Sequence, residues 1–314
     1  MKFWVGVTDN QWYRFLVHLE GVDEVNFWHP SGRPPFTSLP EGTPFLFKLK
    51  RPYHHIAGGG FFVKYETLPL PLAWDAFGEK NGAASYRKLQ ALIGPLRSRD
   101  DGTTPEIGCS ILSSPFFWPE ADWISVGDDF AGNIVTGKTF DTAGTGAGAR
   151  LWQEVERRLA LYPGVAAVAE PEQLAAYGAP VPVRPRRGQG TFRALVTNAY
   201  ARRCAITGEN TLPVLEAAHI KPFANEGLNN TYNGLLLRAD FHKLFDRGLV
   251  TVTPDYRVNV SKAIHEHWFN GKVYYRLHGE KLASLPASPH DQPRADFLAW
   301  HNENVFEKVG DYAP

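Results

Sequence analysis

Residues 215–252, with the sequence LEAAHIKPFANEGLNNTYNGLLLRADFHKLFDRGLVTV, decide the fold of the second half of this chain. Apolar and polar residues alternate over 215–220, and Pro213 and Pro222 bound the alternating segment. This pattern predicts a short strand, because successive side chains on a strand point to opposite faces. His219 then lies at the end of that strand.

The rest of this stretch contains turn and helix signals. Asn233-Gly234 is typical of hairpin turns, so we expect Asn233 on a tight turn close to the strand. From Leu235 onward the apolar residues follow helical spacing, with Asp240 as the expected cap and Gly248 as the expected stop. The stretch therefore predicts a compact unit of strand, loop, strand or extended turn, and helix.

The polar residues of this unit suit phosphodiester chemistry. His219 is a candidate general base, because a neutral imidazole accepts a proton from water near physiological pH. His242 and Asp246 are four residues apart, so on a helix they share one face and can approach a single cation. A lone Asn-Gly is usually only a turn, and a lone helical His is usually structural. Their order within one short unit favours a functional site.

The segments GQGTFR, RRCAITGE, LEAAHIKPF, NGLLL and FHKLFDRG, between Gly188 and about Tyr256, resemble the HNH endonucleases of restriction systems. This resemblance implies a ββα-metal fold. It also implies that His219 activates water, that Asn233 is the central Asn of the motif, and that His242 is a metal ligand on the helix. Asp246 stands where many relatives carry a second helical ligand.

The sequence departs from the family pattern directly before the general base. Many relatives carry His or Asp there as a metal ligand, whereas this chain carries Ala218. Glu216 is the substitute candidate, which gives a predicted ligand set of His242, Asp246 and Glu216. The expected cofactor is a divalent cation, Mg²⁺ or alternatively Mn²⁺, Co²⁺ or Ni²⁺.

The two cysteines predict neither a disulfide framework nor a structural zinc. Cys109 and Cys204 are far apart in the sequence, and Cys204 lacks the second thiolate of a CxxC pair. We expect Cys204 to be a small buried apolar residue.

Charge is distributed unevenly although the formal net charge is zero. Residues 174–208 contain arginines and no acidic residue: Arg184, Arg186, Arg187, Arg193, Arg202 and Arg203. Such a basic stretch suits contact with phosphate. The predicted DNA-binding residues are Arg193, Lys221, Lys243 and Arg247.

The first 165 residues predict a separate α+β domain. A strand and then a helix starting at Asp9 or Asn10 are expected at the N-terminus, followed by a mixed, strongly curved sheet interrupted at Gly58-Gly59-Gly60. Further helices are expected near 83–93 and 150–161. In the second half of the chain, helices are expected over 188–203 and, as the terminal helix, over 294–306. A proline-containing linker is expected over 166–187, followed by the nuclease-like domain over 188–314.

The motifs FWVGVTDNQWYRFL, VNFWHPSG and GGGFFV resemble N-terminal domains of the PUA-like group, which includes EVE and SRA modules. The resemblance implies a curved β-barrel with helices that binds a modified base in an aromatic pocket. A base taken out of the duplex needs aromatic faces for stacking and polar groups for recognition. The predicted pocket residues are Trp12, Asn26, Trp28 and Trp74, and most other aromatic residues are expected in the core.

The two resemblances together imply a metal-dependent DNA endonuclease of the modification-dependent, type IV kind. Its expected partner is double-stranded DNA carrying a modified base, and a homodimer would allow both strands to be cut. Two alternatives stay open. One is a nuclease effector or an RNA-acting nuclease without modification sensing. The other is a nucleic-acid-binding protein with a decayed nuclease half, which Ala218 would explain.

No apolar run of about 18 residues and no signal-peptide pattern is visible, so we expect a soluble, cytoplasmic protein without membrane partners. The apolar content of 43% with nine Trp favours globular folding throughout.

Overall fold

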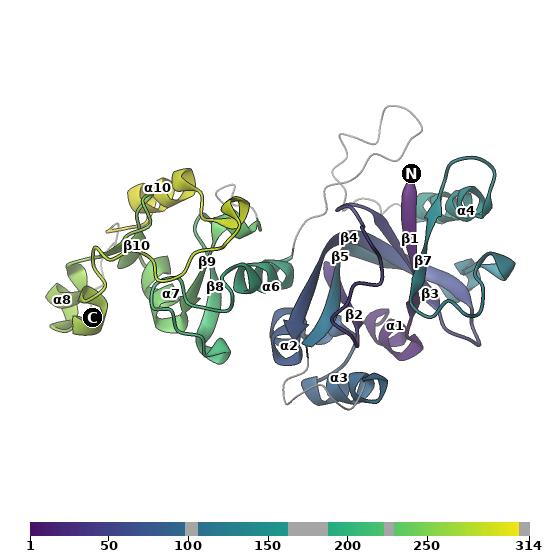
Figure 1. Ribbon diagram of the computed structural model, residues 1–314, viewed down its shortest axis with the longest axis horizontal. Coiled ribbons are helices and arrows are strands. Elements are labelled where there is room, and N and C mark those ends of the chain that lie inside the picture. Colours follow the sequence, from purple (N-terminus) through teal and green to yellow (C-terminus); the bar gives the residue numbers. More distant parts are fainter. Residues whose placement is uncertain (98–105, 163–187, 223–228, 308–314) are drawn as a thin grey trace. The chain divides into compact units, whose positions relative to one another are not determined.

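The structure, a computed structural model, describes residues 1–97, 106–162, 188–222 and 229–307 (Figure 1). The chain forms two compact units, Met1–Gly188 and Gln189–Pro314. The predicted linker over 166–187 lies outside the described residues, so its nature and the exact domain limits stay predictions. The two units are described separately below.

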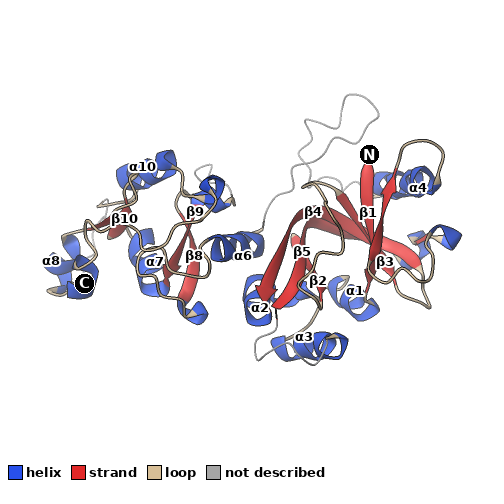
Figure 2. Cartoon of the chain, viewed as in Figure 1, coloured by secondary structure: helices blue, strands red, loops and turns tan. Residues whose placement is uncertain are grey.

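The first unit is a mixed sheet with helices packed beside it (Figure 2). Its elements are β1 (Lys2–Thr8), α1 (Asn10–Leu16), β2 (Glu24–His29), β3 (Pro44–Leu49), β4 (His55–Pro69), α2 (Leu70–Phe77), α3 (Tyr86–Ile93), β5 (Glu106–Phe117), β6 (Ile124–Ser125), β7 (Gly137–Asp141) and α4 (Ala147–Leu161).

The sheet has seven strands in the order β2-β5-β4-β3-β1-β7, with β6 paired to β4. β1 and β3 are parallel and the other pairs are antiparallel, which confirms the predicted mixed sheet. β2 and β7 end the path, so the described strands do not close into the predicted barrel. Register shifts within the β4–β5 pair bend these two long strands.

The triple glycine lies inside β4 and does not interrupt it, contrary to the prediction. A Cβ atom at Gly58 would lie 2.2 Å from the carbonyl oxygen of Phe116, and one at Gly59 would lie 2.7 Å from that of Phe45. Because both neighbours are backbone atoms, only glycine allows this close approach. The glycines therefore allow β4 to pack closely against β3 and β5.

The core of the first unit is aromatic. Trp12 packs edge-to-face on Phe27 and Phe47, with ring centroids 5.4 and 5.2 Å apart. Asp9 caps α1 as predicted, since its side chain accepts hydrogen bonds from the backbone N–H groups of Gln11 and Trp12. The cap fixes the start of the helix that carries Trp12 into the core.

The second unit combines short strands with helices. Its elements are α6 (Gln189–Ala199), β8 (Leu215–His219), a 3₁₀ turn (Thr231–Asn233), β9 (Gly234–Arg238), α7 (Ala239–Asp246), β10 (Val250–Val252), β11 (Val258–Val260), α8 (Ala263–Trp268), α9 (Lys272–Tyr275) and α10 (Ala295–Asn304). The pairs β8–β9 and β10–β11 are both antiparallel.

The predictions for β8 and for the terminal helix α10 are confirmed, whereas two others in this unit are wrong. Leu235–Leu237 form β9 and not the beginning of the helix, and all three side chains are fully buried. Asp240 does not cap α7, because it is the second residue of the helix; its carboxylate pairs with Nε and Nη2 of Arg238, each at 2.7 Å. A run of buried leucines fits a buried strand as well as a helix, and hydrophobic spacing alone did not separate the two.

Gly234 also differs from its predicted role. It has a φ of −124°, so Asn233-Gly234 is not a hairpin turn that needs left-handed backbone. A Cβ at Gly234 would instead lie 2.4 Å from Cγ2 of Val196 on α6. Glycine is needed here because α6 packs directly against the beginning of β9.

No described helix is long and apolar enough to cross a membrane.

Candidate active site

The predicted site residues lie on the unit formed by β8, β9 and α7. In the antiparallel register, His219 lies opposite Gly234 and Glu216 lies opposite Leu237. α7 follows β9 without a loop, so its first turn starts at the edge of the pair. Phe241 and Phe245 bury one stripe of α7 in the core. The i, i+4 spacing places His242 and Asp246 on a different stripe.

His242 lies between two carboxylates. Its Nδ1 is 2.6 Å from Oε2 of Glu216, and its Nε2 is 3.3 Å from Oδ2 of Asp246. Glu216 is two residues before Ala218, so the two share one face of β8. Ala218 itself is fully buried in the core. Ala218 has no side-chain atom that can bind a cation. Glu216, on the same face of β8, places a carboxylate next to His242 instead.

His219 is held by two residues that the motif did not predict. Its ring stacks on Phe192 of α6, with centroids 3.8 Å apart and an interplanar angle of 8°. Its Nε2 lies 2.7 Å from Oδ1 of Asn229. Because a carboxamide oxygen only accepts, the proton of neutral His219 belongs on Nε2, and Nδ1 keeps the lone pair.

The electrostatic surroundings favour the neutral form of His219. Burial lowers the pKa of its imidazole, and the nearby His242 lowers it further. The hydrogen bond with Asn229 and the charge of Asp246 act in the opposite direction, and the net pKa is below its ordinary value. A neutral imidazole at physiological pH is the form that accepts a proton.

Asp246 has the opposite perturbation. Burial raises the pKa of its carboxyl, and the charge of Glu216 raises it further, while His242 and His219 lower it. These mutual effects place Glu216, His219, His242 and Asp246 in one electrostatic cluster. Perturbed titratable groups that cluster in this way are typical of functional sites.

Asn233 is fully buried and holds the backbone that follows His219. Its Oδ1 accepts the N–H of Lys221 at 2.9 Å, and its Nδ2 donates to the carbonyl oxygen of Lys221 at 2.9 Å. Its own carbonyl oxygen accepts the N–H of Ile220 at 2.9 Å. These bonds fix the position at which β8 ends.

The donor types around His242 fit a divalent cation, because imidazole and carboxylate are ordinary ligands for such ions. Both ring nitrogens of His242 face carboxylates, so a bound cation would replace one of these contacts. Among the described residues, no three His, Cys, Asp or Glu side chains converge in a metal-binding arrangement. The ligand set His242, Asp246 and Glu216 stays a prediction.

The four predicted DNA-binding residues come from three places in the second unit. Arg193 lies half-buried on α6, and Lys221 lies two residues after the end of β8. Lys243 and Arg247 are exposed and four residues apart, on or directly after α7. Arg184, Arg186 and Arg187 lie outside the described residues.

Cys204 is free and fully buried, as predicted. Its Sγ accepts the backbone N–H groups of Thr207 and Arg238 at 3.4 and 3.3 Å. The thiol therefore connects the loop before β8 to the end of β9.

Three of the four predicted pocket residues in the first unit bond to one another or to Asn81. Asn26 is fully buried and donates to Oδ1 of Asn81 at 2.9 Å, while Trp28 donates to the Asn81 carbonyl at 3.0 Å. Trp12 is 2% exposed and donates to the Asn26 carbonyl at 3.2 Å. Trp74 lies apart from these bonds, with its ring 6.5 Å from that of Tyr86. Their role in a pocket stays a prediction.

Phe192 and Asn229 are the functional candidates that sequence reasoning missed. Phe192 is part of the predicted helix, but nothing in its spacing indicates a stacking partner for His219. Asn229 belongs to a loop rich in Asn and Gly, which indicated turns and not a hydrogen bond to the base.

Comparison with known proteins agrees with this geometry in the second unit. Residues 204–253 match the HNH endonuclease family and form an HNH endonuclease domain. No curated protein matches the chain. Among solved structures, the chain is similar to a modification-dependent TagI restriction endonuclease at 14% sequence identity, with 94% of this chain and 79% of that chain covered and a TM-score of 0.28.

Proposed function

We propose that this chain, whose residues 204–253 form an HNH endonuclease domain, is a metal-dependent DNA endonuclease that acts on modified DNA. The observation that carries the proposal is the gathering of His219, His242, Glu216 and Asp246 on β8 and α7. A general base beside a set of cation ligands is the combination that phosphodiester hydrolysis needs.

His219 acts as the general base. Its lowered pKa keeps it neutral, and the contact of Nε2 with Asn229 leaves Nδ1 to accept a proton from water. Stacking on Phe192 fixes the plane of the ring, so the lone pair of Nδ1 has one direction. Asn233 is a positioning residue that acts through the Lys221 backbone.

His242, Asp246 and Glu216 hold the cation. When bound, a divalent cation stabilises negative charge on the scissile phosphate and the leaving oxygen. Asp246 and Glu216 supply carboxylate oxygens, and His242 supplies one ring nitrogen. Lys221, Lys243, Arg247 and Arg193 bind backbone phosphates around this centre.

The first unit recognises the modified base. Its motifs resemble PUA-like modules, and it has its own aromatic core. A fixed recognition unit joined to a nuclease unit restricts cleavage to DNA that carries the modification. Two copies acting on opposite strands account for duplex cleavage.

The variant His219→Ala tests the proposal. We expect cleavage to fall by a factor on the order of 10² to 10⁴, because proton transfer by a positioned base contributes about that much. DNA binding measured by fluorescence anisotropy should stay unchanged. His290→Ala, at an exposed histidine of the same unit, is the matched control and should cleave normally. Full cleavage by His219→Ala would contradict the assignment of the base.

A further inference from the structure

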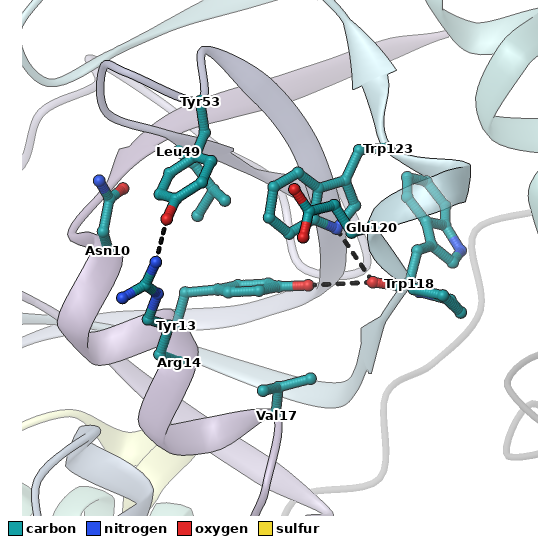
Figure 3. A pocket seen from close by; sticks show the side chains of 10 residues that line it. Asn10, Tyr13, Arg14, Val17, Leu49, Tyr53, Trp118, Glu120 and Trp123 are labelled. Atoms are coloured by element: carbon teal, nitrogen blue, oxygen red, sulfur yellow. Dashed lines mark hydrogen bonds between the residues drawn. The ribbon is translucent and has the colours of Figure 1, made fainter.

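A cavity of about 240 Å³ lies in the first unit, and none of the predicted pocket residues lines it (Figure 3). Its walls come from α1, from the segment after β3 and from the segment after β5. The side chains that decide its chemistry are Tyr13, Arg14, Tyr53, Glu120 and Trp123.

The aromatic walls of this cavity are fixed before any ligand binds. Trp123 packs edge-to-face with both Tyr13 and Tyr53, with centroids 6.0 and 5.5 Å apart. The indole N–H of Trp123 donates to the carbonyl oxygen of Trp118 at 3.0 Å (Figure 3). The hydroxyl of Tyr13 lies 2.9 Å from the carbonyl oxygen of Ala57 and 3.3 Å from that of Trp118. Backbone carbonyls therefore orient two of the three rings.

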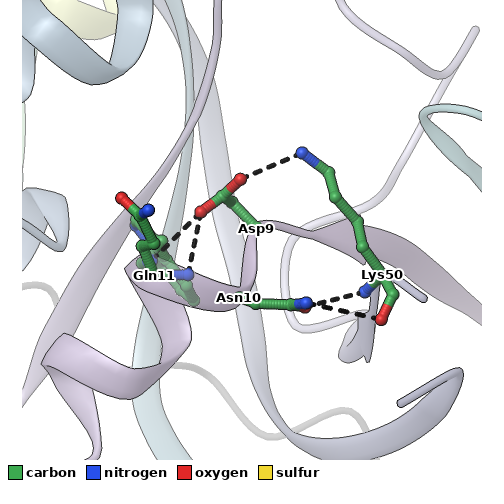
Figure 4. Close-up of polar contacts among 5 residues, drawn as sticks. Asp9, Asn10, Gln11 and Lys50 are labelled. Atoms are coloured by element: carbon green, nitrogen blue, oxygen red, sulfur yellow. Dashed lines mark hydrogen bonds and ion pairs between the residues drawn. The ribbon is translucent and has the colours of Figure 1, made fainter. Parts of the chain in front are cut away.

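The segment that carries Tyr53 is tied to α1 (Figure 4). Asn10 accepts the backbone N–H of Lys50 at 3.0 Å, and Nζ of Lys50 lies 3.0 Å from the carboxylate of Asp9. Arg14 donates to the Tyr53 hydroxyl and lies over the Tyr53 ring. Such preorganisation lowers the entropic cost of binding a ligand.

The polar groups at the rim of the cavity indicate which chemical groups its ligand carries. The carboxylate of Glu120 is exposed at the cavity and makes no hydrogen bond or ion pair with any described residue. A carboxylate accepts hydrogen bonds, and on cytosine and adenine the donor that it can bind is the exocyclic amino group. Arg14 and the exposed Arg51 supply positive charge for the phosphates beside such a base.

The size of the cavity agrees with a single planar ring system. Pockets for drug-sized molecules measure roughly 300–1,000 Å³, and this cavity is smaller. Aromatic side chains stack well on nucleobases, and a base reaches such a cavity only after it leaves the duplex.

We propose that this cavity binds an extruded modified cytosine or adenine, with Glu120 bonded to the exocyclic amino group of the base. Trp123 stacks on the base, and Tyr53, which packs edge-to-face on Trp123, closes the side of the cavity. This assignment rests on the proposed recognition of modified DNA, and it places the recognition site elsewhere than Trp12, Asn26, Trp28 and Trp74.

Binding of the full chain to labelled duplexes, measured by fluorescence anisotropy without divalent cations, tests the proposal. The duplexes carry one 5-methylcytosine, 5-hydroxymethylcytosine, N6-methyladenine or 5-hydroxymethyluracil, or no modification. The hydroxymethyl pair shares its 5-substituent and differs in the amino group. The variants are Trp123→Ala and Glu120→Gln, and Glu20→Gln is the exposed carboxylate control. Trp28→Ala and Trp74→Ala test the pocket predicted from the sequence.

We expect tighter binding to one amino-bearing modified duplex than to the unmodified duplex. Trp123→Ala should weaken that binding by about tenfold, because stacking on one aromatic residue contributes about this much. Glu120→Gln should weaken it by about fivefold and reduce the preference over 5-hydroxymethyluracil. Thermal melting checks that Trp123→Ala is folded, and Glu120→Gln alters only an exposed side chain.

The other outcomes show whether the assignment of the cavity fails, or modification sensing as a whole. A preference for a modified duplex that survives in Trp123→Ala and Glu120→Gln would overturn the assignment of the cavity and leave modification sensing intact. Binding of the 5-hydroxymethyluracil duplex as tightly as the preferred amino-bearing duplex would overturn the role of the amino group. Equal binding of all duplexes, with cleavage retained, would overturn modification sensing and this cavity together.

Discussion

The surroundings of His219 determine its proton affinity and its orientation together. Burial and His242 lower the pKa of the imidazole, Phe192 stacks on its face, and Asn229 contacts Nε2. The motif predicted His219, His242, Asp246 and Glu216, because their positions follow from spacing within a short stretch of sequence. It did not predict Phe192 or Asn229, since stacking and a loop contact depend on tertiary structure that no spacing encodes.

The pH dependence of cleavage follows from the lowered pKa of His219. The neutral form is the base, so kcat/KM should rise with pH and level off above the pKa. The midpoint of this rise should lie below 6.5, the ordinary value for histidine. Asn229→Ala removes a hydrogen bond that raises this pKa, so its midpoint should move to lower pH. A midpoint above 6.5, or a flat profile, would count against His219 as the base.

Glu216 should determine the affinity for the cation. Glu216→Gln removes a negative charge beside His242 but keeps the shape of the side chain. We expect the Mn²⁺ concentration for half-maximal cleavage to rise by roughly tenfold or more, with activity restored at high Mn²⁺. Glu303→Gln, at an exposed position of the same unit, is the control. An unchanged Mn²⁺ requirement would exclude Glu216 from the ligand set.

At the level of elements, the sequence predicted β1, α1, β8, α6 and α10 because each has a clear period or a polar cap. It did not predict α2, whose N-terminus is LPL after Pro69. Pro71 lies in the first turn of α2, where proline is well tolerated. Close packing explains why the glycines of β4 and Gly234 do not have the roles that the sequence predicted. The glycines of β4 and Gly234 are required by neighbouring atoms and not by turns.

Gly234→Ala tests this packing explanation. The new methyl group would meet Val196 at the interface between α6 and β9, so we expect a loss of about 1–3 kcal/mol in the free energy of unfolding. Gly94→Ala places a methyl group in open space and should not destabilise the chain. Urea denaturation followed by circular dichroism measures both. Equal stability of the two variants would show that α6 does not pack closely on β9.

At the level of the whole molecule, the chain has two compact units, and each has its own buried core. The sequence indicated two domains through separate motifs and apolar content, and it indicated the mixed sheet of the first. The barrel prediction was wrong for the described strands because a barrel requires the two edge strands of the sheet to pair. The alternation of apolar and polar residues along a strand does not determine which strands pair. We propose that recognition belongs to the first unit and hydrolysis to the second.

The most direct test is cleavage of one duplex by the full chain in four forms: unmodified, methylcytosine, hydroxymethylcytosine and N6-methyladenine, each with Mg²⁺, Mn²⁺, Co²⁺ or Ni²⁺ in turn. We predict that at least one cation supports selective cleavage of a modified duplex, and that EDTA abolishes it. Equal cleavage of all four forms would contradict modification sensing but leave the nuclease assignment intact. The absence of cleavage with every cation and duplex would contradict the central claim.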